Sequence, residues 1–141
     1  MIPVSHSLYR PLRSILSEVY QRYRRPLFIA ETGIEDDLRA SWLRYVCNET
    51  RAVRKDDVPV EGICLYPIVN HPGWADDRHC HNGLWDYSDK NGLRKIYEPL
   101  ACELRRQQSR FEKAEELYDD RPIGPEDDQG LELSLMEAGS F

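Results

Sequence analysis

Glu31 is the first residue whose type and place in the sequence could do chemistry. It follows a short apolar run at residues 27–30, and Gly33 allows the chain to turn sharply just after it. An apolar run between two helical patterns predicts a buried parallel strand with both faces covered. Because α/β folds place ligand sites at the carboxyl ends of such strands, we expect the Glu31 carboxylate to be partly desolvated and to face a cleft. On position alone, Glu31 could equally cap a nearby helix or pair with an arginine.

A second apolar run ends at Tyr66 and leads into a segment of aromatic and hydrogen-bonding side chains. This segment, residues 70–89, has the sequence NHPGWADDRHCHNGLWDYSD. Such mixtures bind sugars, because aromatic faces pack on the C–H surface of the ring while polar side chains bind its hydroxyls. The tryptophans could also anchor the loop, which is the favoured role for Trp85, whereas the role of Trp74 stays open.

The same segment contains residue types that bind zinc, with His71 followed by His79, Cys80 and His81. Adjacent residues of an extended chain point to opposite faces, and no ligand pair is matched by a second pair at the usual spacing. Nothing marks Cys80 as an activated nucleophile. We therefore expect neither a metal nor a cofactor.

Five elements are needed to position these residues. Apolar side chains recur at three- and four-residue steps in residues 7–23, 36–54 and 97–111, which predicts three helices. Strands are predicted at 27–30 and 60–66, and residues 68–91 are predicted to be a long loop. The order helix–strand–helix–strand–helix defines an α/β fold with a parallel sheet. Two strands leave exposed sheet edges, through which the chain could associate with itself or with a complementing fragment.

Length and charge limit the classes of function. The chain has 141 residues, with 19 Lys+Arg and 25 Asp+Glu, whereas a complete (β/α)₈ barrel needs about 250 residues. The acidic balance argues against nucleic acid as a partner. The sequence contains no apolar stretch near ~20 residues and no signal peptide, so we expect no membrane contact and a cytoplasmic location. The acidic residues 115–141 are expected to be a disordered tail after a domain spanning 1–114.

The two strand-end motifs together resemble glycoside hydrolases with a TIM (β/α)₈ barrel. The similarity is to family 1 glycosidases, typically β-glucosidases, and it is carried by FIAETG at residues 28–33, GICLYPIVNHPGW at 62–74 and NGLWDYSD at 82–89. The resemblance implies that residues 26–106 form the last two βα units of the barrel, and that the helix before them is barrel helix 6. The chain would then be a C-terminal fragment of the barrel.

The resemblance also implies roles for individual residues. Glu31 would be the nucleophile of a retaining glycosidase, and Tyr66, Asn70 and Trp74 would line the sugar pocket. The family's sugar-binding glutamate before the tryptophan is replaced by Gly73. The family's acid/base lies in an N-E-P motif after strand 4, whereas this chain has only Asn48–Glu49 inside a predicted helix.

Two hypotheses follow from this comparison. The first is a glycoside hydrolase that cleaves O-glycosyl bonds by a retaining mechanism, incomplete in this chain because the acid/base is missing. The alternative is a catalytically inactive truncated barrel that acts as a carbohydrate-binding or assembly module. The expected partner is a carbohydrate or glycoside substrate, and under either hypothesis we expect the isolated chain to be inactive.

Overall fold

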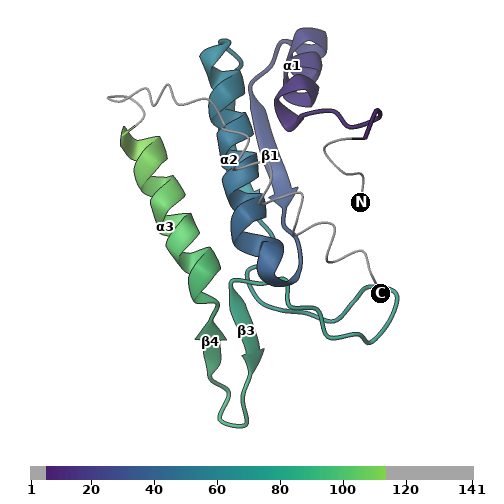
Figure 1. Cartoon of the computed structure of the whole chain (residues 1–141), viewed down its shortest axis with the longest axis vertical. Helices are drawn as coiled ribbons and strands as arrows, with labels where there is room; N and C mark the ends of the chain where they lie inside the picture. Colours follow the sequence, from purple (N-terminus) through teal and green to yellow (C-terminus); the bar gives the residue numbers. More distant parts are fainter. Residues whose placement is uncertain (1–5, 114–141) are drawn as a thin grey trace.

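The computed structural model describes residues 6–113 and confirms a mixed α/β fold. The predicted tail, residues 115–141, lies outside the described residues. The elements in chain order are α1 (Leu12–Tyr23), β1 (Leu27–Thr32), the short 3₁₀ helix η1 (Asp36–Leu38), α2 (Arg39–Lys55), β2 (Val60–Leu65), β3 (Trp85–Ser88), β4 (Arg94–Ile96) and α3 (Glu98–Lys113) (Figure 1). No helix within residues 6–113 is long and apolar enough to cross a membrane.

The strands β1 and β2 form a parallel pair, as predicted. Leu27 pairs with Val60 and Ile29 with Ile63, and the register shifts between these pairs and again before Thr32. Apolar side chains on one face of this pair pack against the helices. One core cluster consists of Leu16, Val53, Val58 and Val60, with Leu27 and Ile29 against it, and a second consists of Leu43, Cys47 and Leu100, with Ile63 and Leu65 against it.

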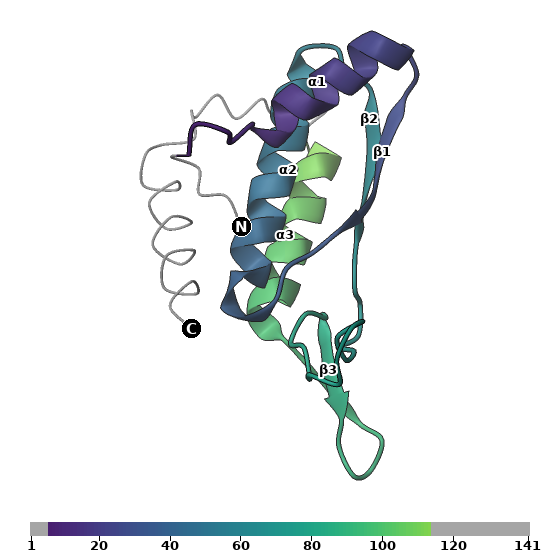
Figure 2. The ribbon, with the colours of Figure 1, turned by 90° about the vertical axis from the view of Figure 1, so that its right-hand side faces the viewer.

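All three helices lie on the same side of the strand pair (Figure 2). Buried polar contacts fix the helices to one another as well as to the strands. Glu49 of α2 is 2% exposed, accepts a hydrogen bond from the backbone N–H of Arg13 at 3.0 Å, and pairs with the Arg13 guanidinium at 3.3 Å. Glu49 thereby fixes α1 to α2, deep in the helix layer and away from the strand ends.

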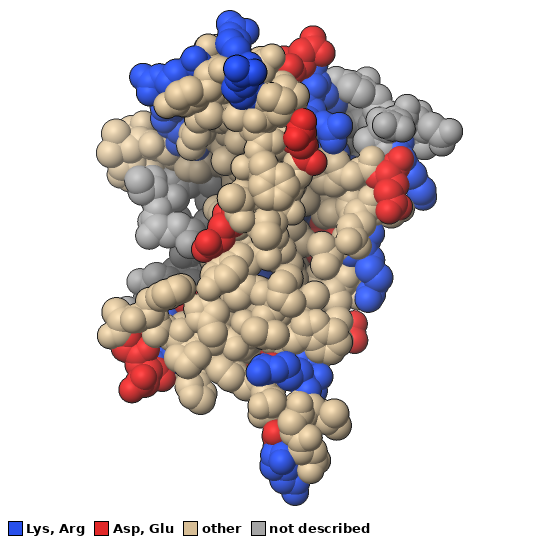
Figure 3. Space-filling view, turned by 180° about the vertical axis from the view of Figure 1, so that it is seen from behind, with Lys and Arg blue, Asp and Glu red and all other residues tan. Residues whose placement is uncertain are grey.

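The other face of the sheet has no covering layer within the described residues. Phe28 is 61% exposed, and Cys64 and Tyr66 are also exposed. Seen from this side, Lys and Arg gather at the two ends of the molecule and the middle is mostly uncharged (Figure 3). The prediction that residues 27–30 are covered on both faces is therefore wrong for this structure, because the helices pack on one face only.

A hairpin occupies part of the segment predicted to be a loop. Strands β3 and β4 pair antiparallel, and the chain turns between Asp89 and Leu93 with Gly92 at φ 79°. Backbone hydrogen bonds from Trp85 N–H to the Ile68 carbonyl at 2.8 Å and from Asn70 N–H to the Trp85 carbonyl at 2.9 Å join the hairpin to the chain that leaves β2. The element order therefore differs from the prediction by these two short strands.

Candidate functional site

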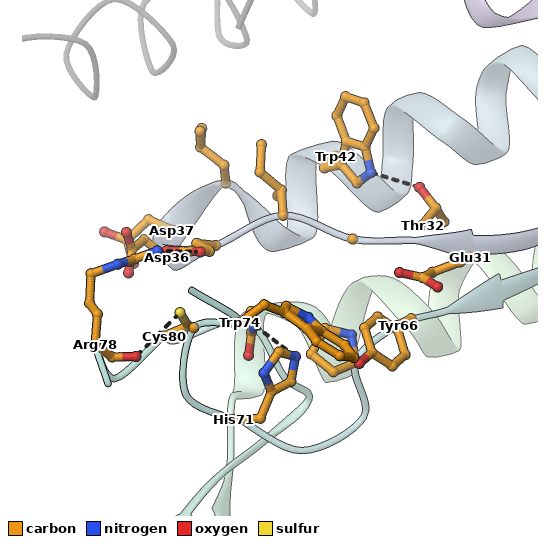
Figure 4. Close-up of a pocket in the computed structure, with 17 residues that line it drawn as sticks. Glu31, Thr32, Asp36, Asp37, Trp42, Tyr66, His71, Trp74, Arg78 and Cys80 are labelled. Carbon is orange, nitrogen blue, oxygen red and sulfur yellow. Dashed lines mark hydrogen bonds and ion pairs between the residues drawn. The ribbon is translucent and has the colours of Figure 1, made fainter. Parts of the chain in front are cut away.

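A cleft of about 1040 Å³ lies where the carboxyl ends of β1 and β2 meet the start of α2 (Figure 4). One wall comes from the end of β1 and the residues that follow it, and the other comes from the loop after β2. Side chains that line the cleft include Glu31, Thr32, Glu35, Asp36, Asp37, Trp42, Tyr66, His71, Trp74, Arg78 and Asn82.

Glu31 is near the end of β1 and lies beside the ring of Tyr66 (Figure 4). Within residues 6–113 its carboxylate makes no hydrogen bond or ion pair, so neither a helix cap nor an arginine partner is present there. The residue is exposed, so the expected partial desolvation is absent. The described residues leave this carboxylate open to a ligand in the cleft.

Gly33 allows the two strand ends to approach closely. A Cβ atom at position 33 would lie 1.8 Å from the carbonyl oxygen of Tyr66, which is far inside van der Waals contact. The backbone N–H of Tyr66 donates to the Thr32 carbonyl at 2.9 Å, and the Thr32 hydroxyl accepts a hydrogen bond from Trp42 at 2.9 Å. These contacts place Glu31 and Tyr66 side by side and fix the start of α2 above them.

Three aromatic rings form the opposite wall of the cleft. The centroids of Tyr66 and His71 are 5.8 Å apart, and those of His71 and Trp74 are 6.2 Å apart in an edge-on arrangement. Trp74 is 87% exposed, so a large apolar ring is presented to solvent at the cleft. From the sequence, His71 was considered only as a possible zinc ligand. Its position in the sequence, close to Tyr66 and two residues before Gly73, was the signal that could have indicated a place in the aromatic wall.

Asn70 is placed differently from the other predicted sugar ligands. It is 4% exposed and is absent from the lining of the cleft. Its amide nitrogen donates to Asp86 at 2.7 Å, and its carbonyl oxygen accepts from the backbone N–H of Gly83 at 2.6 Å. The structure thus brings Glu31, Tyr66 and Trp74 together in the cleft and uses Asn70 to hold the start of the hairpin. A direct sugar contact by Asn70 stays a prediction.

An ion pair missed by sequence reasoning joins the two walls. The Arg78 guanidinium donates to both carboxylate oxygens of Glu35, at 2.6 and 2.9 Å. This hydrogen bonding lowers the pKa of Glu35 despite its partial burial. The pair links residues 43 positions apart, and it keeps Glu35 ionised and unsuited to donate a proton.

The histidines and Cys80 do not assemble into a metal site. Within residues 6–113 no group of three His, Cys, Asp or Glu side chains is placed to hold a metal ion. Burial, followed by the nearby Glu35 carboxylate, raises the pKa of the Cys80 thiol, which is 3% exposed. A thiol with a raised pKa is a poor nucleophile.

A parallel strand pair with helices on one face, and with a cleft at its carboxyl ends, resembles part of an α/β barrel. Solved structures show the same fold. The fold is similar to part of a β-glycosidase from Thermosphaera aggregans, with a TM-score of 0.61 and 21% identity over 69% of this chain and 21% of that one. It is also similar to a family 1 β-glucosidase from Thermotoga maritima, with a TM-score of 0.58 and 15% identity over 72% and 28%.

Aphid myrosinase resembles the chain equally well, with a TM-score of 0.60 and 21% identity over 77% of this chain and 24% of that one. The chain therefore spans 21–28% of the length of these proteins. No protein-family model matches the sequence, and no curated protein is significantly similar to it. At this level of identity the likeness establishes the fold, and it confirms the resemblance to family 1 glycosidases predicted from the strand-end motifs.

Proposed function

We propose that this chain supplies the nucleophile half of a retaining β-glycosidase site, as the C-terminal part of a barrel. The observation that carries this proposal is that Glu31, Tyr66 and Trp74 line one cleft at the carboxyl ends of two parallel strands. A carboxylate next to exposed aromatic rings fits a sugar whose C–H face packs on the rings while its anomeric carbon faces the carboxylate.

In this mechanism a Glu31 oxygen attacks the anomeric carbon, and the bond from that carbon to the leaving-group oxygen breaks. The product is a glycosyl ester of Glu31, which a water molecule then hydrolyses to free sugar and carboxylate. A second carboxyl group must protonate the leaving oxygen and later take a proton from the water. In retaining enzymes it lies about 5–5.5 Å from the nucleophile.

Neither the other carboxylates that line the cleft nor the buried Glu49 suits this second role. Glu49 is buried between α1 and α2 in contact with Arg13. Glu35 is paired with Arg78, and Asp36 and Asp37 lie at the far end of the cleft from Glu31 (Figure 4). The acid/base is therefore supplied by a segment or chain that completes the barrel against the uncovered sheet face.

A second candidate function is an inactive module that binds carbohydrate or assists assembly. The lack of a suitable acid/base among residues 6–113 favours this candidate for the chain acting alone. The glycosidase and the carbohydrate-binding module both require sugar binding and differ in whether Glu31 reacts, whereas an assembly module requires neither. The chain alone is then expected not to cleave ordinary aryl glycosides, because their leaving groups need protonation.

Sugar binding is tested by titration calorimetry of the full chain with methyl β-glycosides of glucose, galactose and mannose. We expect saturable binding of at least one of them, weakened several-fold by Trp74→Ala because the exposed ring is lost. Trp85→Phe, in β3 outside the cleft lining, is the matched control and should bind as the wild type does. Absence of saturable binding to every sugar, or unchanged affinity of the Trp74 variant, would count against this function.

A further inference from the structure

Trp74 lies in a short turn of the loop after β2, which we term the Trp74 turn (residues 72–79). The two end residues of this turn form an isolated antiparallel bridge, and the backbone N–H of Gly73 donates to the Arg78 carbonyl at 2.9 Å. These backbone contacts close the turn, so it carries the side chains of Trp74 and Arg78 as one small unit. A displacement of Arg78 therefore displaces Trp74 with it.

The Trp74 turn has little buried apolar surface to hold it in place. Residues 74–79 are all exposed, and Trp74 itself is 87% exposed. The ring of Trp74 contacts that of His71, with centroids 6.2 Å apart, and the ring of His79 stacks on that of Tyr87 at 4.7 Å. His71 and Tyr87 both belong to the chain that follows β2, so neither ring contact reaches the wall that follows β1.

The side chain of Arg78 connects the Trp74 turn to the wall that follows β1. Its guanidinium donates to both carboxylate oxygens of Glu35, at 2.6 and 2.9 Å. Figure 4 shows Arg78 at the opposite end of the cleft from Glu31 and Tyr66. Two parallel hydrogen bonds between a guanidinium and a carboxylate fix the orientation of both groups. Hydrogen bonding to Arg78 also lowers the pKa of Glu35, so the pair is intact at neutral pH.

The exposure of this ion pair indicates a positional role and not a stabilising one. The side chains of Arg78 and Glu35 are 57% and 37% exposed. Solvent screens such pairs, which therefore add little to the free energy of unfolding. What the pair adds is geometric, because it ties the Trp74 turn to a second segment of the chain. Without it, the ring contacts with His71 and Tyr87 would restrain the turn from one side only.

We propose that the Glu35–Arg78 ion pair is a latch that holds the Trp74 ring at the cleft. Glu35 and Arg78 are then positioning residues, which act on a ligand through Trp74 and touch no reacting atom. The effect of the latch on sugar affinity rests on the proposed function, whereas its effect on the position of the Trp74 ring does not. The two effects are therefore measured separately.

Fluorine NMR of the full chain labelled with fluorotryptophan measures the position of the ring in the absence of sugar. The chain has three tryptophans, and the Trp74 resonance is the one that is lost in Trp74→Phe. Arg78→Gln and Glu35→Gln should each move this resonance towards that of free fluorotryptophan, because the ring leaves its place against His71. The double variant should show the same shift as either single variant, since each change breaks the same pair.

Arg10→Gln is the matched control. It breaks another exposed ion pair, formed with Glu18, whose side chains are 57% and 61% exposed and lie outside the lining of the cleft. The Trp74 resonance should not move in this variant. The latch would be overturned by a Trp74 resonance that stays in place in Arg78→Gln, or that Arg10→Gln moves equally. Shifts that add in the double variant of Glu35 and Arg78 would overturn it as well.

Titration calorimetry with the methyl β-glycosides measures the effect of the latch on a ligand. Arg78→Gln should weaken the sugar affinity several-fold in the wild-type background and leave it unchanged in the Trp74→Ala background, because it acts through the Trp74 ring. A further loss in the Trp74→Ala background would overturn the latch and make Arg78 a direct ligand. If the wild type binds none of the sugars, the proposed function fails, and the Trp74 resonance still decides whether the latch exists.

Discussion

Glu31 lies near the end of β1, and Asn70 follows the neighbouring strand β2, yet their side chains have opposite surroundings. Glu31 is exposed in the cleft, whereas Asn70 is 4% exposed and its side-chain amide is hydrogen-bonded to Gly83 and Asp86. An exposed side chain can contact a ligand directly. A buried one with satisfied hydrogen bonds acts on the ligand only through the loop that it positions.

Asn70→Ala should therefore lower the free energy of unfolding by about 1–3 kcal/mol, because the buried N–H of Gly83 and the carboxylate of Asp86 lose their partner. Urea denaturation of the full chain measures this change. Asn91→Ala, in the exposed hairpin turn, is the control and should stay within about 0.5 kcal/mol of the wild type. If Asn70→Ala keeps its stability but loses sugar affinity, Asn70 is a direct ligand.

At this scale the sequence indicates which residues follow a strand but not which of them become buried. The position of Glu31 at the carboxyl end of a strand could be predicted because the apolar run before it has a clear end. The burial of Asn70 depends on the hairpin packing over it, and the Glu35–Arg78 pair joins residues 43 apart. Neither contact leaves a local pattern in the sequence.

At the level of the secondary-structure elements, the cleft depends mainly on the close approach of β1 and β2 at their carboxyl ends. Gly33→Ala should cost about 1–3 kcal/mol, since the added methyl group would overlap the Tyr66 backbone carbonyl. It should also weaken sugar binding by separating Glu31 from Tyr66. Thermal unfolding and sugar titration measure the two effects.

The matched control is Gly73→Ala, in the same cleft. There the new Cβ would meet the side chain of Asp76, which is exposed and able to move away. We expect a smaller loss of stability than for Gly33→Ala. Equal losses of stability for the two variants would mean that the close approach of the strand ends does not require a glycine at position 33.

The three helices could be predicted because their apolar residues recur at three- and four-residue steps. The parallel strand pair could be predicted because short apolar runs alternate with these helices. The hairpin was missed because β3 and β4 are only four and three residues long. Asn91–Gly92, which forms part of its turn, was a usable signal, since this dipeptide favours tight hairpins. The exposure of Phe28 could not be predicted, because an apolar run does not show how many faces of its strand are covered.

In the whole molecule, as far as residues 6–113 describe it, helices cover one sheet face and leave the other uncovered, with Phe28 61% exposed on the uncovered face. We propose that this face and the strand edges beside it receive the segment or second copy that completes the sheet. Full-length chain without a complementing partner should then self-associate as its concentration rises, which sedimentation equilibrium measures.

Phe28→Lys should shift this association to several-fold higher concentration, because a charge replaces the exposed ring. Leu93→Lys is the matched control, because Leu93 is 68% exposed at the hairpin tip and its replacement removes apolar surface away from the sheet. It should associate as the wild type does. If the two substitutions have equal effects, the association is driven by exposed apolar side chains in general and not by the sheet face.

Covalent labelling distinguishes a nucleophilic Glu31 from an unreactive one. A 2-deoxy-2-fluoro-β-glucosyl fluoride loses fluoride without protonation, so it reacts without an acid/base and forms a slowly hydrolysed ester. Mass spectrometry of the full chain should show the addition of one fluoroglucosyl group, mapped to Glu31 and absent from Glu31→Gln. A chain that binds sugar but stays unlabelled, or is labelled at another residue, would contradict the account.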